Sequence, residues 1–288
     1  MDAQPAQPSP PPKLAIAGLQ IDSVWEDPAA TFHRIEAQLR AAAAGGARLL
    51  VLPEMFATGF SMRADAMASH HDAARAFCAG QARALGVWLI AGMVEPPPHG
   101  HRAPGTATPR PQNCAVLFGP DGSERGRYRK VHPFTFGGEH EHYQGGEALP
   151  TWTIEGVRVT PLVCYDLRFV ELFRMAASET DAFVVIANWP EARWEHWATL
   201  LRARAIECQA YVLGVNRVGE GGGLRYRGDS MLIAPFGEVL ASASAVTTTV
   251  LGQFDAAEVA AVRGRTSFLV DRRPAVYEAI AAARMRPR

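Results

Sequence analysis

Residues 159–173 read VTPLVCYDLRFVELF, and this stretch decides the expected fold. The mostly apolar residues before Cys164 predict a buried strand, and a helical pattern begins at residue 169. A strand that turns sharply into a helix is the repeating unit of α/β domains. Such a turn exposes the side chain that occupies it, and a nearby helix N-terminus favours a thiolate there. Cys164 is therefore a candidate nucleophile, although a cysteine at a strand end is more often a small buried apolar residue.

The same alternation continues along the chain in both directions. We predict strands at residues 14–21, 48–52, 87–94, 114–118, 157–163, 183–188, 211–216, 230–234 and 247–254, and helices at 28–44, 72–85, 169–178 and 193–209. Several of these strands are apolar on both faces, as strands buried between two layers are. The helix at 28–44 has Asp27 as its expected N-cap and Pro28 at its first position. The pattern predicts one α/β domain in which helices cover sheets.

The composition excludes several classes of protein. The 288 residues include 29 Lys and Arg against 29 Asp and Glu, and 48% are apolar. A net charge of zero offers no footprint for nucleic acid or an anionic membrane surface, so we expect neither partner. No apolar run approaches the roughly 20 residues that a membrane-spanning helix needs. Residues 1–12 are proline-rich and lack the features of a secretory signal, which predicts a disordered tail before one domain at 13–288.

Cysteine and histidine usage gives no sign of a disulfide framework or a metal. The four cysteines are scattered without a CxxC pair, which indicates a reduced, cytoplasmic protein; Cys78, Cys114 and Cys208 are expected to be structural. Ligand-type residues occur at 139–142 (EHEH) and in the HGH of residues 99–101. Neither spacing matches HExxH, so we expect no metal. The second group lies in a Pro- and Gly-rich insert at 96–112, which predicts a long hairpin connection.

Two other segments place reactive side chains beside predicted strands. Residues 49–60 (LLVLPEMFATGF) run from a buried strand into Glu54, and a poorly solvated carboxyl has a raised pKa that suits acid–base catalysis. A solvated turn carboxylate is the alternative. Residues 127–136 (RYRKVHPFTF) surround Lys130 with apolar and aromatic residues, so its ammonium is a candidate oxyanion partner, with a surface charge as the alternative.

These motifs, in this order, resemble the nitrilase superfamily of carbon–nitrogen hydrolases. The residues that carry the resemblance are PEMFATGF at 53–60, YRKVHPF at 128–134 and VCYDLRF at 163–169, with further similar segments at 187–217 and 226–239. Val170 stands where this superfamily more commonly has proline. The resemblance covers residue 14 to about residue 280 and implies an α/β fold, a four-layer α-β-β-α sandwich with two mixed sheets packed face to face and helices outside.

Within the superfamily the chain resembles the omega-amidases, which hydrolyse the terminal amide of 2-oxoglutaramate and 2-oxosuccinamate. EHEHY at 139–143, NWP at 188–190 and HW at 196–197 carry this resemblance. It implies Cys164 as nucleophile, Glu54 as general base and Lys130 as oxyanion stabiliser, acting through a thioester without a cofactor. It also implies a second glutamate near the lysine, for which Glu139 fits best and Glu141 is the alternative.

The substrate and its binding residues are less constrained. Deaminated glutathione, an N-carbamoyl amino acid or an aliphatic nitrile are alternative substrates, and a catalytically inactive binding module is a further alternative. A substrate carboxylate requires a cation, for which we consider Arg168, Arg193 and Arg225, with a structural salt bridge at a helix start as the alternative for Arg168. The remaining candidates are the backbone N–H of Tyr165 as an oxyanion donor and a set of aromatic pocket walls, for which core packing is the alternative: Phe60, Phe136, Tyr143 and Trp189. The resemblance also implies a homodimer or larger homo-oligomer formed through the helices at 169–178 and 193–209.

Overall fold

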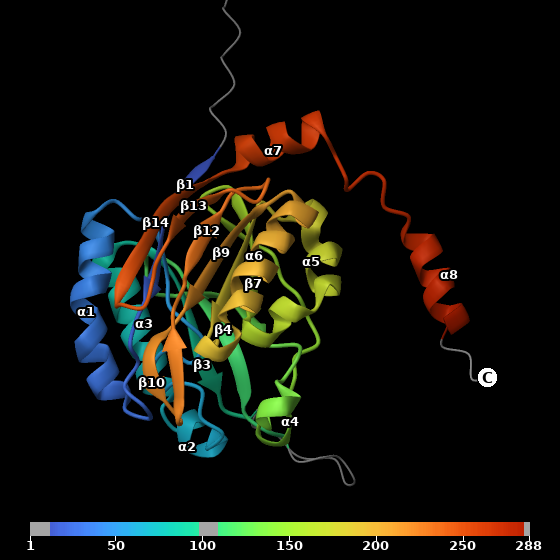
Figure 1. Ribbon diagram of the computed structural model, residues 1–288. Helices are drawn as coiled ribbons and strands as arrows, with labels where there is room; N and C mark the ends of the chain where they lie inside the picture. The colour runs from blue at the N-terminus through green and yellow to red at the C-terminus, as the bar shows by residue number, and fades with distance from the viewer. Residues whose placement is uncertain (1–11, 98–108, 285–288) are drawn as a thin grey trace, which may run out of the picture.

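Two six-stranded mixed sheets form the middle of the molecule (Figure 1). In the first, the order β14-β1-β2-β3-β4-β5 is built from β1 (Lys13–Gln20), β2 (Leu49–Val51), β3 (Trp88–Glu95), β4 (Gln112–Phe118), β5 (Glu124–Arg129) and β14 (Thr248–Asp255). In the second, the order β13-β12-β9-β8-β7-β6 is built from β6 (Trp152–Ile154), β7 (Val157–Val163), β8 (Ala182–Ala187), β9 (Tyr211–Asn216), β12 (Met231–Ile233) and β13 (Val239–Ser242). Each sheet has a parallel centre, with β1-β2-β3 in one and β7-β8-β9 in the other, and antiparallel edges.

Helices cover the outer face of each sheet (Figure 1). On the first sheet lie α1 (Pro28–Ala44) and α3 (His71–Leu85), and on the second lie α5 (Val170–Ala176) and α6 (Trp194–Cys208). The shorter helices are α2 (Ala64–Ala68), α4 (Glu139–His142), α7 (Ala256–Arg265) and α8 (Pro274–Arg284). The order of layers is therefore helix, sheet, sheet, helix, which confirms the predicted four-layer sandwich.

The sheets bury their apolar strands against each other and against the helices. A cluster that includes Leu14, Ile16, Val185 and Leu213 fills the space between the sheets and beneath α5 and α6. A second cluster lies between the first sheet and the pair α1 and α3. The sheets approach closely at Gly18, where a Cβ atom would lie 2.8 Å from a methyl carbon of Val215. This double burial explains why the central strands lack a polar face.

The computed structural model describes residues 12–97 and 109–284. The tail that was predicted to be disordered lies outside the described residues, apart from residue 12. The histidines of residues 99–101 lie outside them as well. The insert does connect antiparallel neighbours, since β3 pairs with β4, which confirms the expected hairpin. Within the described ranges, no helix combines the length and the apolarity that crossing a bilayer requires.

The main elements agree with the sequence pattern and the small ones do not. The predicted bounds of α1, β7 and β9 are those observed, and Asp27 caps α1 by accepting a hydrogen bond from the Ala30 N–H at 3.0 Å. The prediction missed β5, β6, β13 and a small hairpin of β10 (Val218–Gly221) and β11 (Leu224–Arg227), which are short or rich in charge. It also missed α2, α4, α7 and α8. Helix α8 has no buried residue and stands apart from the sandwich (Figure 1).

Candidate active site

Three charged side chains meet inside the sandwich although all three are fully buried. Glu54 follows β2, Lys130 follows β5, and Glu139 begins α4. The Lys130 Nζ donates to Glu54 Oε1 at 3.0 Å and to Glu139 Oε2 at 2.8 Å, and no side chain of the three is more than 1% exposed. The structure therefore brings together the predicted base, the predicted lysine and the predicted second glutamate. Glu141, the alternative second glutamate, has a 68% exposed side chain and is excluded from this cluster.

Two asparagines hold the carboxylates in place. The Asn113 Nδ2 donates to Glu54 Oε1 at 2.7 Å and to Glu139 Oε1 at 2.9 Å. The backbone N–H of Asn188 donates to Glu54 Oε2 at 2.8 Å, and its side chain donates to the Glu54 carbonyl at 2.6 Å. Asn113 was not predicted from the sequence. The available signal was a pair of amide side chains, Gln112 and Asn113, at the start of the apolar strand QNCAVLF, where a buried polar group needs a partner.

The turn that carries Glu54 rests directly on the backbone of β3. A Cβ atom at Gly92 would lie 2.4 Å from the Glu54 Cα and 2.4 Å from the Pro53 carbonyl oxygen. Glycine therefore allows the turn to pack on the strand, and two backbone hydrogen bonds, from Gly92 to Pro53 and from Phe56 to Gly92, fix its position. The backbone as well as the side chain of Glu54 is thus fixed before any substrate binds.

Electrostatics in the cluster favour a permanently charged lysine. Burial disfavours the ammonium of Lys130, but the carboxylates of Glu139 and Glu54 outweigh burial and raise its pKa above the ordinary value. Burial raises the pKa of Glu139, an effect that the Lys130 charge opposes and the Glu54 charge reinforces. An ammonium held by two carboxylates in a dry site is a fixed positive charge that can meet an oxyanion.

The charge balance makes Lys130→Met a severe substitution. We expect it to lower the free energy of unfolding by about 3–5 kcal/mol at neutral pH, because two buried carboxylates lose their cation. Without the cation, burial raises the pKa of Glu139 further, so the folded state binds a proton more readily than the unfolded state. The deficit should therefore be smaller at pH 5 than at pH 8 in urea unfolding.

The chain offers a matched control for this prediction, since Lys13 is its only other lysine. Lys13 pairs with Asp255 at 2.9 Å at the surface, where its side chain is 55% exposed. Surface pairs of this kind contribute only about 0–1 kcal/mol, so Lys13→Met should have a small effect with little dependence on pH. Equal losses in the two variants would contradict the assigned role of the buried pair.

Cys164 occupies a left-handed backbone conformation at the end of β7. Its φ is 47°, which is uncommon for a residue other than glycine, and it begins the short 3₁₀ turn Cys164–Arg168. Its side chain is half-buried, whereas Cys78, Cys114 and Cys208 are buried. The sharp turn after a buried strand therefore exposes this thiol alone among the four cysteines.

The buried carboxylate of Asp166 holds this turn in place. It accepts hydrogen bonds from the Val163 N–H at 3.1 Å, the His132 N–H at 3.0 Å and the Tyr128 hydroxyl at 2.7 Å. Because Tyr128 and His132 flank Lys130, one carboxylate ties the cysteine turn to the lysine segment. Our sequence analysis did not single out Asp166, since an acidic residue in a turn gives no local sign of burial.

The expected thiolate is wrong for the resting protein. Burial raises the pKa of the Cys164 thiol well above its usual value, and the Glu54 carboxylate raises it further. Lys130 lowers the pKa but does not offset these two effects. No α-helix N-terminus compensates, because the 3₁₀ turn intervenes and α5 does not begin until Val170. The group at rest is therefore a neutral thiol, which needs a base at the moment of attack.

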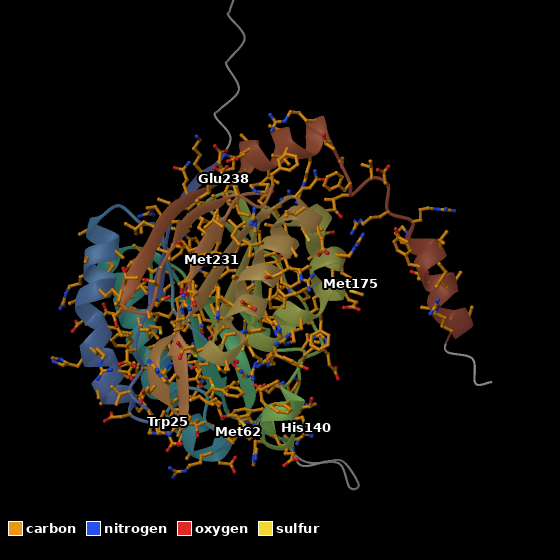
Figure 2. All side chains as sticks on the ribbon, in the orientation of Figure 1. Trp25, Met62, His140, Met175, Met231 and Glu238 are labelled. Atoms are coloured by element: carbon orange, nitrogen blue, oxygen red, sulfur yellow. The ribbon has the colours of Figure 1, made fainter. Side chains whose placement is uncertain are left out.

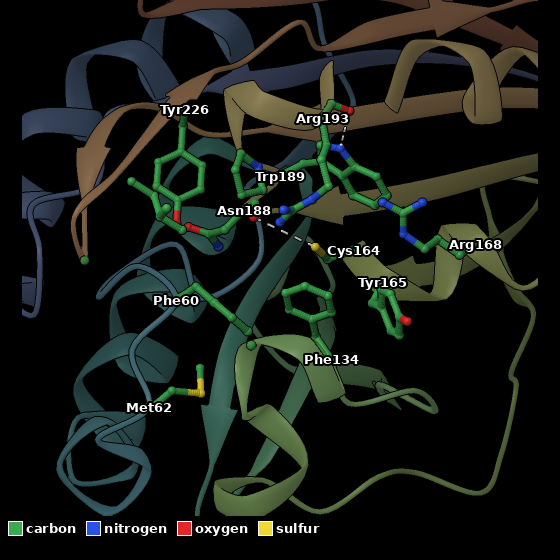
Figure 3. A pocket seen from close by; sticks show the side chains of 14 residues that line it. Phe60, Met62, Phe134, Cys164, Tyr165, Arg168, Asn188, Trp189, Arg193 and Tyr226 are labelled. Carbon is green, nitrogen blue, oxygen red and sulfur yellow. Dashed lines mark hydrogen bonds between the residues drawn. The ribbon is translucent and has the colours of Figure 1, made fainter. Parts of the chain in front are cut away.

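An open pocket of about 750 Å³ lies over Cys164 (Figure 3). Four of the predicted substrate-binding residues line it, namely Phe60, Tyr165, Arg168 and Trp189. Arg193 lines it too, whereas Arg225 is 74% exposed and lies near Glu191 and Glu220 outside this pocket. The pocket walls are largely aromatic, with cations at one side.

Two of the predicted pocket walls lie elsewhere. Phe136 is 87% exposed because it sits within the 3₁₀ turn Thr135–Gly137, which directs Phe134 to the pocket instead. Tyr143 is only 1% exposed, and its hydroxyl donates to the Ser61 carbonyl at 2.6 Å. Tyr143 therefore packs beneath the site and does not face a substrate.

Among the described residues, no group of three or more His, Cys, Asp or Glu side chains is arranged to hold a metal ion. In the EHEH segment at 139–142, Glu139 accepts hydrogen bonds from Lys130, Asn113 and the Phe134 N–H. Its carboxylate oxygens are thus already satisfied by N–H donors from three residues.

A sandwich of two sheets, with a buried glutamate–lysine pair whose charges act on a cysteine thiol at the pocket, defines a class of hydrolases. The family model for carbon–nitrogen hydrolases matches residues 13–264, and the chain belongs to this family, as the sequence motifs predicted.

Known relatives agree with this assignment. The chain is 39% identical to omega-amidase YafV of Escherichia coli, over 83% of this chain and 88% of that protein. It is 29% identical to the 2-oxoglutaramate amidase of Bacillus subtilis, over 92% of this chain and all of that protein (100%). A CN-hydrolase superfamily protein of Xanthomonas campestris, solved with an arsenic adduct in its active site, superposes with a TM-score of 0.81 at 33% identity, covering 91% of this chain and 97% of that one.

Proposed function

We propose that this protein is an omega-amidase, which hydrolyses the terminal amide of 2-oxoglutaramate and 2-oxosuccinamate to the 2-oxo diacid and ammonia. The observation that carries the proposal is the pocket over Cys164, whose charged lining residues within the described chain are two arginines and no carboxylate. The substrate matches this arrangement, with an amide at one end and a carboxylate at the other. The names of the relatives from Escherichia coli and Bacillus subtilis support the same substrate class.

The first half of the reaction forms a thioester. Glu54 takes the thiol proton while the Cys164 sulfur attacks the amide carbon, which places negative charge on the former carbonyl oxygen. The Lys130 ammonium and the Tyr165 N–H stabilise that oxygen, and such donors contribute about 3–4 kcal/mol each. Glu54 then gives its proton to the nitrogen, the carbon–nitrogen bond breaks, and ammonia leaves.

The second half of the reaction releases the acid. Glu54 takes a proton from water as the water oxygen attacks the thioester carbon, and Lys130 again stabilises the oxyanion. When the carbon–sulfur bond breaks, the proton on Glu54 returns to the Cys164 sulfur. Glu139 acts on Lys130 throughout, because its carboxylate holds the ammonium at 2.8 Å and maintains its charge.

Turnover of a panel of substrates tests the proposal, measured as ammonia release for 2-oxoglutaramate and the nitrile and as cysteinylglycine release for deaminated glutathione. We expect the purified protein to turn over 2-oxoglutaramate with a kcat/KM far above its values for deaminated glutathione and a simple aliphatic nitrile. Deaminated glutathione carries the same 2-oxo acid but a dipeptide on its amide nitrogen, and a simple aliphatic nitrile has no carboxylate for the two arginines to bind. A protein inert on 2-oxoglutaramate but active on another amide would reject the substrate and retain the chemistry.

We also propose that the protein works in the cytoplasm. All four cysteines are free, as is usual in a reducing compartment.

We further propose that the protein is a homodimer. The outer surface of α5 supports a dimer, since Met175 is 75% exposed there and projects from the molecule (Figure 2). A monomeric mass by light scattering at micromolar concentration would reject the dimer.

A further inference from the structure

Two guanidinium groups enter the pocket without an acidic partner. Arg168 leaves the 3₁₀ turn that begins at Cys164, and Arg193 ends the short turn Glu191–Arg193 that precedes α6. In Figure 3 their guanidinium groups lie on either side of the Trp189 ring. Across the described part of the chain, neither forms a salt bridge, although several other arginines do. Unpaired cations at a partly buried site imply that an anion binds there.

The structure positions both groups through aromatic contacts. The Arg168 guanidinium lies 4.6 Å from the Trp189 ring centre, and that of Arg193 lies 5.5 Å from the Phe134 ring centre. The Trp189 indole N–H donates to the Arg193 carbonyl at 2.8 Å, which ties the two arginines to one indole. Stacking holds a guanidinium by its face and leaves the N–H groups at its edge free.

Hydrogen bonding leaves these edges almost unused. Within the described ranges, the Arg168 guanidinium has two long contacts of 3.4 Å, both to the His196 Nδ1, and no other hydrogen bond. For Arg193, the hydrogen bonds found among the described residues involve its backbone and none involves its guanidinium. The two charges also repel each other, since burial and then the charge of Arg193 lower the pKa of Arg168. An anion between the two guanidinium groups would supply the missing hydrogen-bond acceptors and would offset the repulsion between the two charges.

We propose that Arg193 determines substrate specificity and that it forms with Arg168 a two-guanidinium receptor for the adjacent 2-oxo and carboxylate groups of the substrate. This inference rests on the proposed omega-amidase function and assigns a residue to its selectivity. A 2-oxo acid presents three acceptor oxygens close to one plane, and a guanidinium edge donates to two acceptors at once. A neutral amide would leave both guanidiniums without an acceptor, which disfavours it.

Kinetics on two substrates test the assignment. For Arg193→Leu we expect the ratio of kcat/KM on 2-oxoglutaramate to kcat/KM on butyramide to fall about 10- to 100-fold, as for the loss of hydrogen bonds to a charged group. The change should come mainly from KM for the charged substrate. Arg193→Lys keeps the charge without the planar edge and should recover part of the ratio. Arg225→Leu, outside the pocket, is the matched control and should leave the ratio unchanged. An unchanged ratio in Arg193→Leu would overturn the proposal.

A binding measurement separates this proposal from the proposed function. The product 2-oxoglutarate carries the same 2-oxo acid group, so it should raise the melting temperature of Cys164→Ala but not of Cys164→Ala with Arg193→Leu. Equal shifts in the two proteins would overturn the role of Arg193. If the wild-type protein releases no ammonia from 2-oxoglutaramate, the proposed function fails, while the melting shifts still decide whether Arg193 binds a 2-oxo acid. The melting temperatures without product reveal any folding defect.

Discussion

Cys164→Ala is expected to lower kcat for ammonia release from 2-oxoglutaramate by at least about 10⁴-fold, as removal of a covalent nucleophile does in other hydrolases. Among the described residues that line the pocket, none is a serine, a threonine or a second cysteine. No nearby side chain can therefore take over the attack. The lysine and the glutamates remain in place, so substrate binding should persist while turnover is lost. Coupled detection of ammonia measures the first quantity, and the melting shift with 2-oxoglutarate measures the second.

The control for this substitution is Cys208→Ala. Cys208 is buried in α6, and burial raises its pKa to about 12, so its thiol is unreactive at neutral pH. Its replacement should cost some stability but leave kcat close to that of the wild type. Full activity in Cys164→Ala would reject the covalent mechanism outright. Loss of activity in both variants would point to a folding defect, which their melting curves would reveal.

The fold and the three proposed reacting groups could be predicted from the sequence because their signals are local. Glu54 and Cys164 each follow a strong apolar run, Lys130 is followed by apolar and aromatic residues, and each sits within a motif that is specific when the three occur in order. Strands that are apolar on both faces also predicted burial between two layers, as the central strands show. Local patterns therefore predicted an α/β domain, and the resemblance carried by the ordered motifs implied the four-layer sandwich and the proposed chemistry.

The residues that hold the site in place could not be predicted from the sequence, because their role depends on contacts between distant segments. Asn113 bonds to Glu54 from another strand, and Asp166 bonds to Tyr128 and His132 from another sheet. Nothing in the sequence around either residue indicates these partners. The prediction that Phe136 lines the pocket was wrong for a related reason, since a single 3₁₀ turn decides which aromatic ring faces the pocket. Turn geometry of this kind is fixed by its surroundings more than by residue type.

The charge state of Cys164 was also beyond sequence reasoning, and it leads to the prediction for Glu54→Gln. We expect this substitution to lower kcat by about 10²- to 10⁴-fold, since it removes the general base. It should at the same time make the thiol more acidic. The Glu54 carboxylate raises the thiol pKa and Lys130 lowers it, so removing the carboxylate charge leaves the lysine effect less opposed. The pH midpoint for alkylation of Cys164 by iodoacetamide should therefore shift to lower pH.

A lower kcat together with a more acidic Cys164 thiol distinguishes a base from a structural residue. A variant that merely loosened the site would lose turnover, and it would admit water to the thiol without a specific change in charge. The control is Glu141→Gln, which changes an exposed carboxylate in the same helix as Glu139. It should alter neither kcat nor the alkylation midpoint. An alkylation midpoint that stays at the wild-type value in Glu54→Gln would show that the Glu54 charge does not act on the Cys164 thiol. Glu54 would then lie too far from the sulfur to take its proton, which would contradict its role as the general base.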